Sequence, residues 1–281
     1  MKRHTWRTIV LLVLTLFVVL TIAGTETMAD TVTIEQTVLL DQNGIKITAK
    51  SIDMSGLLGP EVKMLFENNS DKSVTIQVRN ASINGYMVDP TMSVDITPGN
   101  KANSQMRIMK AELERAGITT IADIEFSFHV FDSSSWDTIF DSDMVRIETS
   151  VANTYQYTFD STGDQVFHDN NIDIVIKGLA EKDSVLGKQI IVYIANESDT
   201  NITVQARNMS VNGFMIDPIF SCDVVVGKHA VDTIILPKKN LEENEIQTIE
   251  TVTLSFHIYD AITWKTIVDS PMVTWQNSHE P

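Results

Sequence analysis

An internal duplication is the feature that most constrains the fold of this chain. The segment QVRNASINGYMVDP at residues 77–90 returns as QARNMSVNGFMIDP at residues 205–218, and SFHVFD at 127–132 returns as SFHIYD at 255–260. Both pairs lie 128 positions apart. Solenoid repeats have periods of about 20–50 residues, so a period of this length indicates two whole domains of one fold.

Two domains also fit a chain of 281 residues, since a domain takes roughly 150 residues. We expect the first domain over residues 31–149 and the second over residues 154–276. The register between the copies holds without a gap from Glu67 and Ala195 onward. Before that point the match is looser and needs a one-residue slip.

Strand patterns recur along each copy. Apolar residues alternate with polar ones over 124–130 and again over 252–258, which indicates strands with one buried face. Asn84–Gly85 and Asn212–Gly213 suit the left-handed conformations of a type I′ hairpin turn. The only helix-like stretches, 109–117 and 237–245, are short. The sequence therefore predicts an all-β chain made of two tandem immunoglobulin-like antiparallel β-sandwiches.

The two copies share the motifs N-x-S-D, S-[IV]-N-G-[YF]-M-[VI]-D-P and F-H-[VI]-[FY]-D followed by a tryptophan. This tandem pattern resembles the uncharacterised immunoglobulin-like domains of secreted and surface proteins in Gram-positive bacteria. The resemblance covers both copies and implies export and a β-sandwich. It transfers no catalytic residue.

The N-terminus has the layout of an export signal. Three basic residues precede an apolar run at Ile9–Ile22, and small and polar residues follow it. We expect residues 1–29 to be either a signal peptide cleaved after Ala29 or an uncleaved membrane anchor. In both cases the body of the chain lies outside the cell or on its surface.

Composition restricts the partners. The chain carries 21 Lys and Arg against 37 Asp and Glu, a net charge of −16. A nucleic-acid partner needs a cationic surface, so none is expected, and membrane contact is expected only through the N-terminal segment. The single cysteine, Cys222, forms no intramolecular disulfide and is interpreted as a small buried hydrophobe.

No catalytic motif is present: G-x-S-x-G, S-x-x-K with its partners, H-E-x-x-H and a glycine-rich phosphate loop are all missing. We therefore predict no catalytic residue, no cofactor site, no metal site and no enzyme activity. His129 and His257 face outward on their strands and are interpreted as cross-strand hydrogen-bonding residues.

Clustered carboxylates were considered as Ca²⁺ ligands in the first copy: Asp132, Asp137, Asp141 and Asp143. The second copy has Lys265 and Pro271 at two of these positions, so solvated turn aspartates are the better interpretation. Paired carboxylates for acid/base chemistry are offered by four glutamates on the short helical links, for which a solvated face is the better interpretation: Glu112, Glu114, Glu242 and Glu243. Five Asn-x-Ser/Thr sequons are present, at Asn68, Asn80, Asn196, Asn201 and Asn208, and the paired ones are interpreted as turn residues.

Six aromatic and methionine side chains are the remaining candidates for partner contact. They are Tyr86, Met87, Phe214 and Met215 beside the Asn-Gly turns, and Trp136 and Trp264 after the histidine motif. The alternative for the hairpin residues is that they close one end of the core.

Three functions follow from this sequence. The first is a non-enzymatic extracellular or cell-envelope protein that binds an unidentified protein or acts as a spacer. The second is a carbohydrate-binding or adhesion module that stacks a glycan on exposed aromatic rings. The third is a metal-dependent hydrolase with a carboxylate-lined site between the domains, near residues 146–166.

Overall fold

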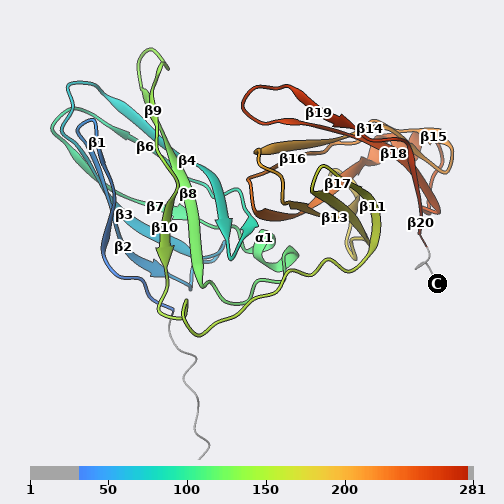
Figure 1. Cartoon of the computed structure of the whole chain (residues 1–281), viewed down its shortest axis with the longest axis horizontal. Coiled ribbons are helices and arrows are strands. Elements are labelled where there is room, and N and C mark those ends of the chain that lie inside the picture. The colour runs from blue at the N-terminus through green and yellow to red at the C-terminus, as the bar shows by residue number, and fades with distance from the viewer. Residues whose placement is uncertain (1–31, 278–281) are drawn as a thin grey trace, which may run out of the picture. The chain divides into compact units, whose positions relative to one another are not determined.

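The computed structural model describes residues 32–277, and this part of the chain is all-β with two short helices (Figure 1). The expected signal peptide or anchor, residues 1–29, lies outside the described residues. Within the described range no helix has both the length and the apolar character that a membrane crossing needs.

The elements form two matching series. The first series, here called the first half, comprises β1 (Thr37–Gln42), β2 (Ile45–Asp53), β3 (Glu61–Asn68), β4 (Val74–Ile83), β5 (Tyr86–Met87), β6 (Ser93–Ile96), β7 (Lys101–Arg107), α1 (Lys110–Arg115), β8 (Asp123–Asp132), β9 (Thr138–Asp141) and β10 (Val145–Glu148). The second half comprises β11 (Asp164–Asp169), β12 (Ile172–Leu179), β13 (Gly187–Asn196), β14 (Ile202–Val211), β15 (Phe214–Met215), β16 (Ser221–Val224), β17 (Lys228–Pro237), α2 (Lys238–Glu243), β18 (Thr251–Asp260), β19 (Thr266–Asp269) and β20 (Val273–Gln276).

Each half is a two-layered sandwich. In the first half, β1, β2, β3 and β7 form one sheet, and β4, β5, β6, β8, β9 and β10 form the other. The second half repeats both sheets with the corresponding strands. Buried side chains from both sheets share one core in each half, and among these are Phe66 of β3 and Phe126 of β8. The expected all-β sandwich architecture is therefore confirmed.

The strand register preserves the duplication. Val74 pairs with Asp132 between β4 and β8, and Ile202 pairs with Asp260 between β14 and β18, both at the same spacing. The one-residue slip expected between the aligned copies is seen at the first turn of each half. The β1–β2 turn is Asn43–Gly44 and the β11–β12 turn is Asn170–Asn171, with all four residues left-handed.

Positive φ angles explain the Asn-Gly pairs that occur in both copies. Asn84 and Gly85 have φ of 49° and 79°, and Asn212 and Gly213 have φ of 50° and 87°. These values are those of a type I′ turn, so both predicted hairpins are confirmed. Each hairpin places one short strand beside a longer one, β5 beside β4 and β15 beside β14.

The two halves contact each other within one compact unit that begins at Val32. A parallel bridge between Tyr86 of β5 and His229 of β17 joins a sheet of the first half to a sheet of the second. All other strand pairings within residues 32–277 are between neighbours of the same half. The expected domain boundaries, 31–149 and 154–276, remain a prediction.

More residues of β8 are buried than the alternation of its apolar and polar side chains predicts. Phe126, Phe128 and Val130 lie in the core as expected, but His129 and Phe131 on the opposite face are also buried. The opposite face is covered because Trp136 stacks on Phe131 and Asp141 pairs with His129. The outer face of this strand is thus the starting point for the candidate site.

Candidate functional site

The tips of two matching hairpins carry the most exposed aromatic residues among residues 32–277. Trp136 follows β8 and Trp264 follows β18, and each is 74% exposed. Figure 1 shows both hairpins, β8–β9 and β18–β19, projecting beyond the neighbouring strands of their sheets. The sequence analysis identified both tryptophans, and the structure places them in solvent.

Both tryptophans have a left-handed backbone, with φ of 65° at Trp136 and 61° at Trp264. Residues other than Gly, Asn and Asp rarely adopt this region, which costs on the order of 1–2 kcal/mol. The turn that enforces it is closed by Asp132 and Asp260, whose backbone carbonyls each accept the tryptophan N–H at 2.9 Å.

The same aspartates also cap the turn through their side chains. Asp132 Oδ1 accepts the backbone N–H of Ser134 at 2.9 Å, and Asp260 Oδ1 accepts that of Thr263 at 2.7 Å. These backbone donors lower the pKa of both carboxyls below the usual value. The expectation of a turn role for Asp132 therefore agrees with its hydrogen bonds.

Each tryptophan lies flat on an aromatic ring of the preceding strand. Trp136 stacks on Phe131 with ring centroids 5.5 Å apart and an interplanar angle of 19°, and Trp264 stacks on Tyr259 at 5.6 Å and 17°. Phe131 and Tyr259 are themselves buried. The stacking fixes one face of each indole and leaves the other toward solvent.

A histidine continues each stack. The ring centroid of His129 lies 5.3 Å from that of Phe131, and His257 lies 5.2 Å from Tyr259. His129 Nδ1 lies 2.6 Å from Asp141 Oδ1. His257 and Asp269 repeat this pair at the same distance.

Since a carboxylate only accepts, Nδ1 of each histidine carries the proton and donates it. This agrees with the predicted cross-strand hydrogen-bonding role of the histidines. Asp141, which was interpreted as a solvated turn residue, instead orients a histidine ring. Within residues 32–277 no group of three or more potential ligands is arranged to hold a metal ion.

The surroundings of the two tips differ. In the first half Asp137 follows Trp136. In the second half Lys265 follows Trp264, and Ile262, which is 75% exposed, lies two positions before Trp264. The repeated part of the site is therefore the ladder of histidine, aromatic residue and tryptophan, here called the aromatic ladder. Such a surface can stack on a flat or apolar ligand face.

The other expected contact residues differ between the halves. Tyr86 is only 3% exposed, because it packs between the halves against Val175, Tyr193 and Ala195. Its ring is thus neither open to a separate partner nor part of the core of the first half. Phe214, its counterpart, is 49% exposed.

The two methionines differ between the halves in the same way as Tyr86 and Phe214. Met87 packs against the core of the second half, whereas its counterpart Met215 is 68% exposed.

A cleft of about 480 Å³ lies between α1 and strands β16 and β17, and it carries several carboxyl groups. Burial raises the pKa of Glu112 and of Asp232, although Arg115 pairs with Asp232 at 3.0 Å. Glu112 accepts the backbone N–H of Asp89 at 3.1 Å. Glu112 was expected on a solvated face, and this is wrong because α1 packs toward the second half.

This cleft is lined by carboxylates, but it does not lie near residues 146–166, where a hydrolase site was expected. The carboxyls of Asp232 and Glu112, both partly buried, are engaged by Arg115 and by a backbone N–H respectively. Cys222 also lines it, and burial raises the pKa of its thiol well above the usual value. The cysteine is buried, as expected for a small hydrophobe.

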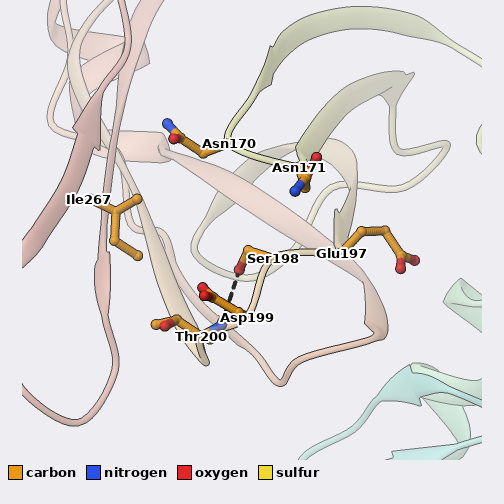
Figure 2. Close-up of a pocket in the computed structure, with 7 residues that line it drawn as sticks. All are labelled: Asn170, Asn171, Glu197, Ser198, Asp199, Thr200 and Ile267. Carbon is orange, nitrogen blue, oxygen red and sulfur yellow. Dashed lines mark hydrogen bonds between the residues drawn. The ribbon is translucent and has the colours of Figure 1, made fainter.

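A second depression, of about 420 Å³, lies beside the N-E-S-D motif of the second half. Figure 2 shows that the carboxylates of Glu197 and Asp199 point in different directions and do not converge on a common point. Asn196 at the start of this motif is fully buried. Its amide donates to the carbonyls of Thr200 and Val224, so this sequon is a structural turn residue, as interpreted from the sequence.

Two features of the aromatic ladder were missed in the sequence analysis. The first is the stacking partner, Phe131 or Tyr259, and the second is the histidine partner, Asp141 or Asp269. The signal was present, because the F-H-[VI]-[FY]-D motif places the histidine and the second aromatic residue two positions apart, on one face of a strand.

Comparisons with known proteins identify no relative. No family model matches the chain, and no curated protein matches it. Among matching solved structures is the Salmonella enterica SafA pilin in complex with the SafB chaperone, with 8% sequence identity and a TM-score of 0.20. That match covers 84% of this chain and 98% of the other, and at this TM-score it carries no argument about function.

Proposed function

We propose that the chain is an exported, non-enzymatic binding protein of the extracellular space or cell envelope. Its two tandem β-sandwich domains would present one aromatic ladder each to a partner. The observation that carries this proposal is that both copies hold a tryptophan 74% exposed in a left-handed turn.

Stability alone does not account for this arrangement. An exposed bulky residue at positive φ costs free energy, and backbone strain of this kind concentrates at functional sites. Exposed tryptophan is also the residue type most enriched at binding hot spots, because it buries a large area with few rotatable bonds. A contact surface therefore explains what a purely structural turn does not.

A carbohydrate is the second candidate partner, favoured by the flat indole face that the stacking leaves open. Binding sites for small polar ligands combine an apolar surface with a few placed polar groups. The oriented pairs His129–Asp141 and His257–Asp269 supply such groups beside each ladder. Two ladders on one chain would also increase avidity for a repeating glycan.

The test compares binding of the intact exported chain with that of its double variant Trp136→Ala/Trp264→Ala, on immobilised oligosaccharides and on intact bacterial cells. We expect the double variant to lose binding by at least tenfold while its circular dichroism spectrum stays unchanged.

The matched control is the double variant Leu57→Ala/Val185→Ala, which removes two repeat-equivalent loop residues that are 94% and 97% exposed. It should bind as the unmodified chain does. Equal binding by the tryptophan variant would refute the proposal, and turnover of any substrate would refute its non-enzymatic part. Binding to cells but to no oligosaccharide would favour a protein partner.

A further inference from the structure

The two Asn-Gly hairpins have nearly the same sequence but different surroundings. The hairpin that contains β5 is covered, since Tyr86 is 3% exposed. Within residues 32–277 the hairpin that contains β15 is left open, since Phe214 and Met215 are 49% and 68% exposed. The first half therefore shows directly what covers a hairpin of this type.

Two parts of the chain cover β5. The first is the edge of β17, where the backbone N–H of His229 donates to the carbonyl of Gly85 at 2.9 Å. The second is the segment of residues 155–160, YQYTFD, which crosses the hairpin. Its Phe159 meets the Tyr86 ring edge-on with centroids 5.1 Å apart, and the backbone N–H of Asp160 donates to the Tyr86 hydroxyl at 3.0 Å.

Aromatic residues alternate along this covering segment. Tyr155 and Tyr157 have ring centroids 6.5 Å apart, and Tyr157 and Phe159 have theirs 5.8 Å apart. The fit is close at the turn, because a Cβ added at Gly85 would lie 2.9 Å from Cζ of Phe159. At Gly213, with nearly the same φ, no atom of the described residues lies within 4 Å of the corresponding position.

Within the described residues, the edge of a second copy that corresponds to the β17 edge does not match the β15 hairpin. The residues of the second half that receive β5 are His229 and Ala195, and the corresponding residues of the first half are Lys101 and Glu67. These two form an ion pair on an exposed edge. Burying Phe214 and Met215 there would desolvate both charges, so the free edge of β7 is a poor acceptor.

We propose that the β15 hairpin is a docking site for an extended segment of a partner protein with alternating aromatic residues, of the kind seen at residues 155–160. Phe214 keeps the aromatic ring of Tyr86 and lacks its hydroxyl, so the contact is apolar and needs no backbone donor. This site is separate from the aromatic ladders and does not depend on them.

The test measures the fluorescence anisotropy of a labelled peptide with the sequence of residues 153–161, NTYQYTFDS, added to the intact chain. We expect saturable binding, weakened at least tenfold in the variant Phe214→Ala/Met215→Ala. Binding should also be lost with a peptide in which the three aromatic residues are alanine. The control variant Ile262→Ala, exposed on another hairpin of the same half, should bind as the unmodified chain does.

Absence of peptide binding would overturn the proposal, as would equal binding by the Phe214→Ala/Met215→Ala variant. Self-association of the unmodified chain that this variant abolishes, measured by sedimentation, would make a second copy the occupant and would also overturn it. Peptide binding that persists in Trp136→Ala/Trp264→Ala would support this site even if the aromatic ladders fail their own test.

Discussion

The left-handed backbone of Trp136 predicts that two substitutions at this position reduce binding equally but change the free energy of unfolding by different amounts. Trp136→Ala removes the stack on Phe131 but keeps a side chain at φ of 65°. Trp136→Gly removes the same stack and also relieves the backbone. Both variants should lose binding at this tip, but they should differ in their free energy of unfolding.

The magnitudes follow from exposure and backbone conformation. About a quarter of the Trp136 side chain is covered, on the order of 60 Å², which is about 1.5 kcal/mol of burial lost in either variant. Glycine recovers about 1–2 kcal/mol of left-handed strain, less about 0.4–1 kcal/mol for the greater freedom of its unfolded chain. Trp136→Gly should therefore be more stable than Trp136→Ala by about 0.5–1 kcal/mol.

Urea unfolding followed by far-ultraviolet circular dichroism measures this difference without using tryptophan as the probe. The corresponding pair at Trp264, with φ of 61°, should show the same order and serves as an internal replicate. If the alanine variant is the more stable one at both positions, the strained turn and the argument built on it are wrong.

Three further predictions rest on other buried groups. Asn68→Asp places an oxygen where the Asn68 amide donates to the carbonyls of Lys72 and Ile96, both at 2.8 Å. Urea titration should show a free energy of unfolding lower by about 2–4 kcal/mol, and a loss below about 0.5 kcal/mol would contradict the hydrogen-bond assignment. Burial lowers the pKa of His229 below 6.5, so the unfolded chain binds the proton more readily than the folded chain, and the stability present above pH 6.5 should decline as the pH falls below that value. His229→Gln should flatten this part of the plot of urea midpoint against pH, and an unchanged plot would contradict the prediction. Cys222 should react with a thiol reagent only after unfolding, because burial raises its pKa; fast labelling of the folded chain would show an open thiol.

Local chemistry made much of the fold predictable. Asparagine followed by glycine favours two successive left-handed residues, so the turns at Asn84–Gly85 and Asn212–Gly213 follow from two residues each. Alternation over 124–130 likewise follows from the burial of one strand face. Both signals depend on neighbours in the chain. The turns are as predicted, whereas β8 is buried on its second face as well, through contacts that its own alternation does not indicate.

The aromatic ladder could not be predicted from residues adjacent in the sequence, because its contacts depend on how two strands and their turn pair. The pair His129–Asp141 spans 12 positions and depends on the register shift between β8 and β9. The positive φ of Trp136 depends on a turn closed by Asp132, and no propensity of tryptophan suggests it. A single sequence therefore indicates an aromatic near the turn but not its exposure or its stacking partner.

The fate of the two hairpins shows most clearly where local sequence stops being informative. Tyr86 and Phe214 lie in nearly identical segments, yet one is buried and the other is open. The difference comes from residues outside the two hairpins, namely His229, which pairs with Tyr86, and Phe159 in the segment between the halves, which packs against Tyr86. The first hairpin is an internal contact between the halves. Within residues 32–277 the second hairpin leaves its apolar side chains exposed, and this contrast is the physical basis for the partner that we propose.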